Sequence, residues 1–217
     1  MNYRIALFGT SADPPTAGHQ EICRWLGLHY DWVAVWASDN PFKSHQTPLA
    51  HRSMMLSLML EELRSPNQSP YQSPYQSTIQ SPPNLLANPI TNIDLHQDLS
   101  SPRTLETVAK AQHLWGQEAD LTVVIGSDLI PQLSRWYRIT DLLQQVQLLV
   151  IPRSGYPLED QDLQELKLMG GKITIAHVHP PDVSSTDYRE YGDRATVTPP
   201  IADYINRENL YSCQNLA

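Results

Sequence analysis

The stretch YRIALFGTSADPPTAGHQ, from Tyr3 to Gln20, is the part of the sequence that most clearly indicates the fold. Its first part, Tyr3–Phe8, is short, apolar and flanked by polar residues, which is typical of a buried strand. Small and turn-forming residues follow, and a helical pattern begins near Gly18. A strand, a glycine-containing loop and a helix in direct succession indicate the first unit of an α/β protein with a ligand-binding loop.

The remainder of the chain repeats this alternation of strands and helices. Further short apolar runs predict strands at Trp32–Ala37, Leu121–Ile125, Leu148–Ile151 and Ile173–His177. Helical spacing occurs between them at His51–Leu63, Arg103–Trp115 and Leu158–Met169. Strands that alternate with helices form a mostly parallel sheet with helices on both faces. We therefore predict an α/β, Rossmann-like, doubly wound fold that binds ligands at the carboxyl ends of its strands.

Length and composition limit the classes of protein that remain. With 217 residues, a single domain spanning residues 1–217 is expected. The formal net charge of -8 supplies no cationic field for polymeric nucleic acid, so any phosphate-binding charge has to be local. Cys23 and Cys213 cannot build a disulfide framework, which favours a reducing cytoplasm. No segment reaches the roughly 20 apolar residues that span a bilayer, so we expect no membrane association.

One segment departs from the alternation of strands and helices. Residues 65–84 consist mostly of Ser, Pro, Gln, Asn and Tyr, and include a tandem SPYQ at 69–76. Such a stretch has too few apolar residues to offset the entropy lost on ordering it. We predict a disordered low-complexity insertion at the surface, and a proline-rich recognition segment is the less favoured alternative.

The first loop has the features of a phosphate-binding site. Gly9 lets the backbone approach a ligand closely. Gly18 and His19 fall at the start of the next helix, where free amides and the helix dipole favour an anion. From that position His19 can donate a hydrogen bond to a phosphate oxygen. The alternative is a loop whose glycines only set a turn and whose histidine is incidental.

Two later stretches carry groups suited to a nucleotide. Gly126 and Asp128 follow a predicted strand, where the carboxylate can accept hydrogen bonds from ribose hydroxyls or, alternatively, cap the next helix. The run Ser184–Thr186 supplies hydroxyls before a helix, and Arg189 lies one turn further along. An isolated cluster of this kind is more often a simple cap. Its occurrence together with the first loop favours phosphate binding.

These stretches resemble the signatures of the HxGH nucleotidyltransferases, and the whole chain is similar to the bacterial nicotinate mononucleotide adenylyltransferases. Members of that family typically read GGTFDPPHxGH at the first loop. This sequence departs from the pattern at Thr10, Ser11, Ala12 and Thr16, and Thr16 retains a hydroxyl that other branches of the superfamily have there. The IGSD, LSRWY, RSG and VSSTDYR runs and the closing segment Pro200–Tyr211 resemble further family motifs in the same order.

The resemblance implies an enzyme that transfers AMP from ATP to nicotinate mononucleotide and releases pyrophosphate, with Mg²⁺ on the phosphates. It implies three catalytic residues, His19, Thr16 and Arg189. It implies that ATP is bound by Gly9, Thr10, Ser11, Gly18, Gly126, Asp128, Ser184, Ser185 and Thr186. For the acceptor it implies Lys43 at the phosphate, Thr104 beside the base, Trp136 stacked on the pyridine ring and the Tyr137 amide at the carboxylate. It implies no protein ligand for the metal.

Several alternatives remain open from the sequence. Arg52 could have a functional role, cap a helix or be a surface charge. Arg153 is expected near the nucleotide. Thr104 could only start a helix, and Trp136 could be a core residue. The acceptor could instead be nicotinamide mononucleotide or phosphopantetheine, and a homo-oligomer is not excluded. The departures in the first loop also leave open a protein that binds nucleotide without catalysis.

Overall fold

The computed structural model describes residues 3–39, 45–65 and 88–211. Lys43, Cys213 and all but the first residue of the predicted insertion lie outside the described residues. Among those described, no helix has the length and apolar character needed to cross a membrane.

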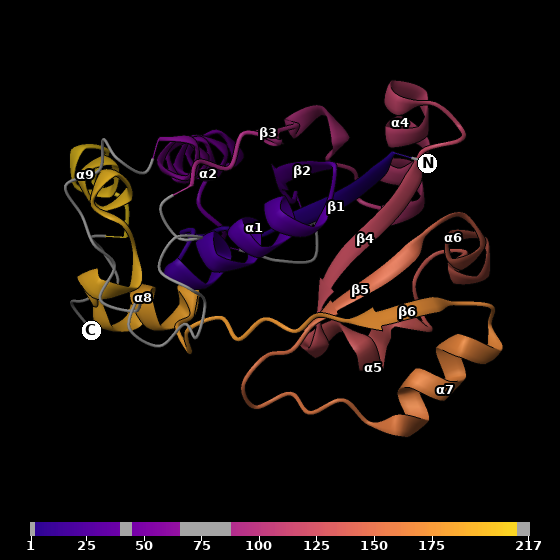
Figure 1. Cartoon of the computed structure of the whole chain (residues 1–217). Coiled ribbons are helices and arrows are strands. Elements are labelled where there is room, and N and C mark those ends of the chain that lie inside the picture. Colours follow the sequence, from indigo (N-terminus) through magenta and orange to yellow (C-terminus); the bar gives the residue numbers. More distant parts are fainter. Residues whose placement is uncertain (1–2, 40–44, 66–87, 212–217) are drawn as a thin grey trace.

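Six parallel strands form one sheet in the order β3-β2-β1-β4-β5-β6 (Figure 1). The strands are β1 (Arg4–Thr10), β2 (Trp32–Ala37), β3 (Ile93–Leu95), β4 (Asp120–Gly126), β5 (Gln147–Ile151) and β6 (Lys172–Ile175). The described α-helices are α1 (Ala17–His29), α2 (Leu49–Arg64), α4 (Thr104–Trp115), α5 (Ile130–Leu133), α6 (Ile139–Gln145), α7 (Asp160–Leu168), α8 (Ser185–Tyr191) and α9 (Pro199–Arg207). Short 3₁₀ segments are η3 (Gln97–Leu99), η4 (Ser127–Leu129) and η5 (Arg194–Thr196).

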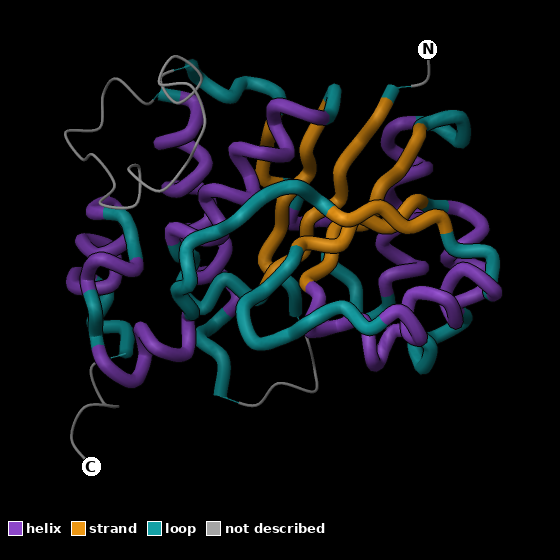
Figure 2. Tube along the Cα trace, turned by 60° about the horizontal axis from the view of Figure 1, so that its bottom comes forward, coloured by secondary structure: helices purple, strands orange, loops and turns teal. Residues whose placement is uncertain are grey.

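Helices cover both faces of the sheet because successive side chains of each strand point to opposite sides. In β1, Ala6 and Phe8 pack into a core shared with α1, α2, α8 and α9. Ile5 and Leu7 pack into a second core with α4, α5, α6 and α7. The strands therefore lie between two groups of helices (Figure 2). The predicted Rossmann-like, doubly wound fold is confirmed.

The strand order places the ligand-binding edge of the sheet. The chain leaves β1 toward β2 on one side, while β4 pairs with β1 on its other side. In a parallel sheet of this kind, ligands bind in the crevice at the carboxyl ends of the strands where the order reverses. The loop after β1 and the 3₁₀ segment η4 after β4 both begin at this crevice. The two glycine-containing stretches found in the sequence are thus neighbours.

Two parts of the sheet differ from the sequence prediction. The edge strand β3 is only three residues long, too short to produce a periodic signal, and was not predicted. Strand β6 ends at Ile175 rather than His177. In the loop that follows, Ala176 and Val178 are buried while His177 and His179 are exposed. The short apolar run that predicted the strand therefore includes Ala176, which is buried but lies beyond the end of β6.

Candidate active site

His19 is oriented by a reciprocal pair of hydrogen bonds at the start of α1. Thr16 is the N-cap residue, and its hydroxyl accepts the backbone N–H of His19. In return, Nδ1 of His19 accepts the backbone N–H of Thr16 at 3.1 Å. The Thr16 hydroxyl also lies 2.9 Å from the same Nδ1. This capping box fixes the imidazole relative to the first loop.

The hydrogen bonding of His19 determines where its proton lies. Because Nδ1 accepts a backbone N–H, the neutral ring carries its proton on Nε2. Burial, and then the positive charge of Arg153, lower the pKa of His19 from 6.5 to about 4. At neutral pH the ring is therefore uncharged, and Nε2–H is a hydrogen-bond donor available to a ligand.

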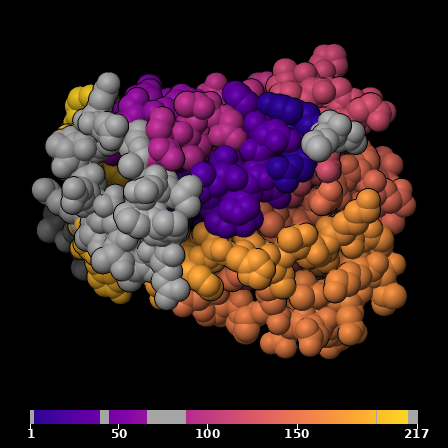
Figure 3. Space-filling model, viewed as in Figure 1, coloured from indigo at the N-terminus to yellow at the C-terminus, as the bar shows by residue number. Residues whose placement is uncertain are grey.

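The late helix α8 packs directly against the first loop. Ser185 donates a hydrogen bond from its hydroxyl to the carbonyl of Pro14 at 2.8 Å. Arg189, one turn along α8, donates from Nη1 to the carbonyl of Asp13. In the space-filling view, the indigo surface of the N-terminal residues lies beside the orange surface of the later part of the chain (Figure 3). The structure thus brings together the two stretches that the sequence predicts to share a polyphosphate.

The three hydroxyl residues at the start of α8 have different structural tasks. Ser184 is the N-cap, and its hydroxyl accepts the backbone N–H of Asp187 at 3.0 Å. Ser185 contacts the first loop, and the Thr186 hydroxyl accepts a hydrogen bond from Nη2 of Arg189 at 3.2 Å. The capping alternative therefore holds for Ser184. Direct contacts of these residues with ATP stay a prediction.

Asp128 and Arg153 form an ion pair beside the same crevice. Nη1 of Arg153 lies 3.1 Å from Oδ2 of Asp128, and the other carboxylate oxygen is buried without a hydrogen-bond partner. A Cβ on Gly126 would lie 2.3 Å from that unpartnered oxygen. Gly126, which precedes η4, therefore leaves room for the ion pair. Asp128 lies inside η4 rather than at its N-cap, so the capping alternative for Asp128 is wrong.

Gly9 and Gly18 differ in how much space a side chain would have at each position. A Cβ on Gly9 would lie 2.6 Å from the Trp36 ring, so the glycine makes room for an aromatic side chain of β2. At Gly18 a Cβ would meet nothing closer than 3.4 Å, from the Thr16 hydroxyl. Packing against Trp36 thus explains Gly9 without a ligand. The predicted contacts of both glycines with ATP are not tested by the structure.

Arg52 is buried and structural. It is 2% exposed, and its Nε donates to the carbonyl of Thr47 at 2.8 Å. Its Nη1 donates to the carbonyls of Ser11 at 2.9 Å and Ser38 at 2.8 Å. These bonds join the loop after β1 to the loop after β2. The alternative of a surface charge is wrong, because the guanidinium holds the two loops together from inside.

A contact between the C-terminal segment and the first loop was not predicted from the sequence. Tyr211 donates from its hydroxyl to Oδ1 of Asp13 at 2.8 Å, and the backbone N–H of Thr47 donates to Oδ2 at 3.3 Å. Asp13 is only 4% exposed. Burial raises the pKa of the Tyr211 phenol, so it remains a proton donor at neutral pH. Residues 198 positions apart thus fix the loop that carries the predicted phosphate contacts.

Replacing Tyr211 with Phe should lower the free energy of unfolding by about 1–3 kcal/mol, because the buried Asp13 carboxylate loses one of its donors. Urea denaturation followed by circular dichroism measures the change. Tyr191→Phe is the control, since Tyr191 is 77% exposed on α8. Equal stability of the Tyr211→Phe and wild-type proteins would show that the Asp13 contact does not brace the loop.

The predicted acceptor residues that are described lie on two segments, the start of α4 and the loop after α5. Thr104 is the first residue of α4, so it does start a helix, with Arg103 preceding it at the N-cap position. The guanidinium of Arg103 lies 4.1 Å from the centre of the Tyr137 ring, which joins the start of α4 to the loop after α5. Trp136 is partly buried against the second core. Both segments thus meet in space, as the predicted acceptor site requires.

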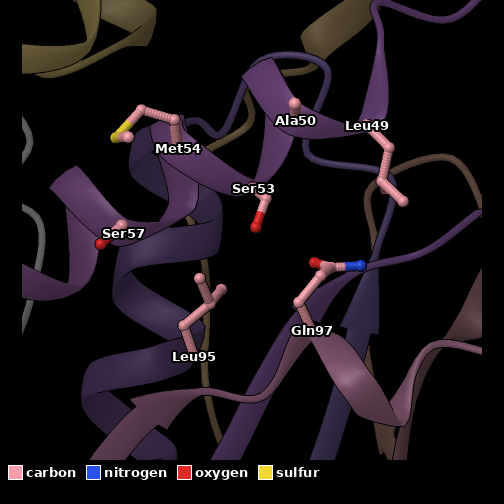
Figure 4. Close-up of a pocket in the computed structure, with 7 residues that line it drawn as sticks. All are labelled: Leu49, Ala50, Ser53, Met54, Ser57, Leu95 and Gln97. Atoms are coloured by element: carbon pink, nitrogen blue, oxygen red, sulfur yellow. The ribbon is translucent and has the colours of Figure 1, made fainter.

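A groove elsewhere in the molecule contains none of the predicted site residues. It has a volume of about 410 Å³ and is lined by Leu49, Ala50, Ser53, Met54, Ser57, Leu95 and Gln97. Ser53 points from α2 toward Leu95 and Gln97 across the groove (Figure 4). None of these seven side chains titrates near neutral pH or offers a nucleophile activated by a base. The groove therefore has no means of catalysing the predicted reaction.

A comparison with known proteins shows the class of protein to which the chain is similar. A family model described as cytidylyltransferase-like matches residues 7–191, a range that includes the first loop, η4 and α8. The chain thus belongs to the class of cytidylyltransferase-like proteins. Solved structures agree on the fold: a nicotinic acid mononucleotide adenylyltransferase of Plasmodium falciparum complexed with NaAD superposes with a TM-score of 0.73, at 19% identity and 100% coverage of both chains.

Two related sequences show which family of this class the chain is similar to. A probable nicotinate-nucleotide adenylyltransferase of Synechocystis sp. is 38% identical over 96% of this chain and 98% of the relative. A nicotinate-nucleotide adenylyltransferase of Bacillus subtilis is 24% identical over 78% of this chain and 83% of the relative. The chain belongs to the nicotinate-nucleotide adenylyltransferase family. The family predicted from the separated motifs is confirmed.

Proposed function

We propose that the chain transfers the adenylyl group of ATP to nicotinate mononucleotide, forming nicotinate adenine dinucleotide and pyrophosphate. The observation that carries this proposal is the contact of α8 with the first loop. Ser185 and Arg189 of α8 donate hydrogen bonds to the carbonyls of Pro14 and Asp13, in the loop that leads to Thr16 and His19. The family of the chain supports the same reaction.

The reaction needs no nucleophile from the protein. An oxygen of the acceptor's 5'-phosphate attacks the α-phosphorus of ATP, and a new P–O bond forms. The bond between the α-phosphorus and the bridging oxygen breaks, so that pyrophosphate leaves with the bonding electrons. The protein contributes by aligning the two reactants and by stabilising the charge that moves onto the leaving group.

His19 supplies the best-defined donor for this purpose. Its Nε2–H would donate to a phosphate oxygen of ATP, and its orientation is already fixed by the capping box before substrate binds. Thr16 was predicted to contact phosphate itself. Its buried hydroxyl lies 2.9 Å from Nδ1 of His19, so we propose that Thr16 acts by orienting the imidazole. Arg189 would direct its remaining N–H groups to the polyphosphate.

The two halves of the crevice would hold the two reactants. Asp128 lies on the β4 side, and its carboxylate, with 24% of the side chain exposed, is suited to accept hydrogen bonds from the ribose of ATP. Thr104, Trp136 and Tyr137 lie on the α4 side, where the pyridine nucleotide would bind. Lys43, outside the described residues, completes the proposal as a cation for the acceptor's phosphate.

Mg²⁺ suits this site as an ion that is bound to the substrate ATP. Among residues 3–39, 45–65 and 88–211, no three His, Cys, Asp or Glu side chains gather closely enough to hold a metal ion. Mg²⁺ in nucleotide sites is held largely by phosphate oxygens and water. We propose that the ion enters on the phosphates of ATP and, when bound, neutralises part of their charge.

We also propose three broader properties of the chain, which concern its domain organisation, its cellular environment and its self-association. Residues 1–217 would form a single nucleotidyltransferase domain, because one sheet takes its strands from both halves of the chain. A reducing cytoplasm suits Cys23, a buried free thiol. Self-association would be measured by light scattering of the purified chain.

An acceptor panel tests the proposed function. Pyrophosphate release should be fast with ATP and nicotinate mononucleotide, and slower with nicotinamide mononucleotide. Phosphopantetheine should give no release, and CTP should not replace ATP. Preference for another acceptor would assign the chain to a different reaction within the same class. Tight ATP binding by calorimetry, with no pyrophosphate from any acceptor, would identify a nucleotide-binding protein that lacks catalysis.

A further inference from the structure

Ser127 occupies a buried position between the two best-defined parts of the nucleotide crevice. It lies in η4, between Gly126 and Asp128, and is 2% exposed. Its hydroxyl donates to the carbonyl of Tyr156 at 2.9 Å and accepts the backbone N–H of Arg153 at 3.0 Å. One side chain thus holds both ends of the turn from Arg153 to Tyr156, which follows β5.

This turn also carries an antiparallel bridge between Arg153 and Tyr156. The side chain of Arg153 leaves the turn toward the crevice, where it pairs with Oδ2 of Asp128 at 3.1 Å. The side-chain exposure of Arg153 is 50%, so little else holds the guanidinium in place. The position of the guanidinium therefore depends on the backbone of the turn, which the Ser127 hydroxyl fixes.

We propose that Ser127 is a positioning residue of the nucleotide site, which holds Arg153 so that its guanidinium pairs with the Asp128 carboxylate. This inference rests on the proposed function. It adds a residue that the family resemblance leaves unassigned within the IGSD run.

The charges around Arg153 explain why its position matters. Without Arg153, the Asp128 carboxylate would present an uncompensated negative charge to the negatively charged triphosphate. Paired with Asp128, the guanidinium cancels that repulsion and offers N–H donors to phosphate oxygens. It also acts on His19, because its positive charge contributes to the low pKa of that imidazole. Displacing Arg153 thus affects both nucleotide affinity and the protonation of His19.

The test compares Ser127→Ala, Arg153→Gln and the double variant with the wild-type protein. Each single change is expected to raise the Kd for ATP about tenfold, which corresponds to the loss of one charge-assisted hydrogen bond. Calorimetry measures the Kd with Mg²⁺ and ATP alone, so this readout does not require turnover. Ser57→Ala is the matched control, since that serine lies on α2 and donates a hydrogen bond to the nearby Glu61 at 3.5 Å.

Two results separate positioning from mere stabilisation. The double variant should bind ATP no more weakly than Arg153→Gln, because Ser127 acts through Arg153. The acid limb of the pH–kcat profile should move to higher pH in both single variants, because His19 loses the nearby positive charge. A merely structural serine would lower Tm without changing that limb.

Additive losses in the double variant, or an unchanged Kd and acid limb in Ser127→Ala, would overturn the proposal. If Ser127→Ala does not fold, Arg153→Gln decides by itself, because normal ATP affinity and an unmoved acid limb in that variant would equally overturn it. Failure of the proposed function is a separate result. It would be seen as absent pyrophosphate release by the wild-type protein, while the calorimetric comparison still reports on Ser127.

Discussion

The His19→Ala variant should lose about 10²–10³-fold in kcat, while its KM for ATP changes little. The reason is that Nε2–H is the donor fixed in advance by the Thr16 capping box. A donor that strengthens as charge moves to the leaving pyrophosphate contributes to the transition state more than to binding. Steady-state pyrophosphate release at saturating ATP and acceptor measures the effect.

His29→Ala is the matched control for this variant. His29 lies on the same helix α1, but it is exposed and stacks on Trp25 with ring centres 3.8 Å apart. It should retain wild-type kcat. Full turnover by His19→Ala would show that the imidazole does not contact the reacting phosphates.

The pH dependence of the wild-type enzyme gives a second signature of His19. Because the pKa of His19 is lowered to about 4, kcat should stay constant as the pH falls through 6.5 and drop only near pH 4. Protonation there places a proton on Nδ1, which would break its bond with the Thr16 backbone. The neutral His19 also contributes to the free energy of unfolding. This contribution is fully present above pH 6.5 and is lost as the pH falls toward 4, because the unfolded chain takes up the proton at a higher pH than the folded chain.

The Gly126→Ala variant should have the second largest effect, a decrease of about 10²-fold in kcat/KM for ATP. The added Cβ would lie 2.3 Å from Oδ1 of Asp128 and 2.9 Å from Cδ of Arg153. Both side chains would have to move, and a shift of about 1 Å in a substrate-positioning group is enough to slow a reaction by this factor. Kinetics at varied ATP concentration measure the loss.

Gly27→Ala separates this effect from general destabilisation. Its added Cβ would lie 2.3 Å from Cγ2 of Ile90, an equal overlap far from the predicted site residues. It should lower Tm while the folded enzyme keeps its KM for ATP. If Gly126→Ala and Gly27→Ala had the same kinetics, the Asp128–Arg153 pair would not be part of the nucleotide site.

The sequence predicted most of the strands and the helices with clear apolar spacing, but it did not predict the helices α6 and α9. The strand Trp32–Ala37 was predicted to the residue, and the main helices within a few residues of their ends. The edge strand β3 was missed because three residues carry no period. The end of β6 was misplaced because the apolar run continues past Ile175 to Ala176, which is buried in the following loop.

For the site, the sequence identified residues that act locally. The three-residue spacing of Thr16 and His19 allows the capping box. The contacts that join distant segments could not be predicted, because no local pattern reports them. The buried carbonyl contacts of Arg52 and the Tyr211–Asp13 hydrogen bond depend on the folded path of the chain. Ser127 gave no signal either, since a single serine beside a glycine is ordinary.

The most direct measurement is a crystal structure of the chain with Mg²⁺ and a non-hydrolysable ATP analogue. We expect the phosphates to lie between Nε2 of His19 and the guanidinium of Arg189, with the ribose hydroxyls at Asp128. Phosphates bound away from the first loop, with neither His19 nor Arg189 within hydrogen-bond distance, would contradict it.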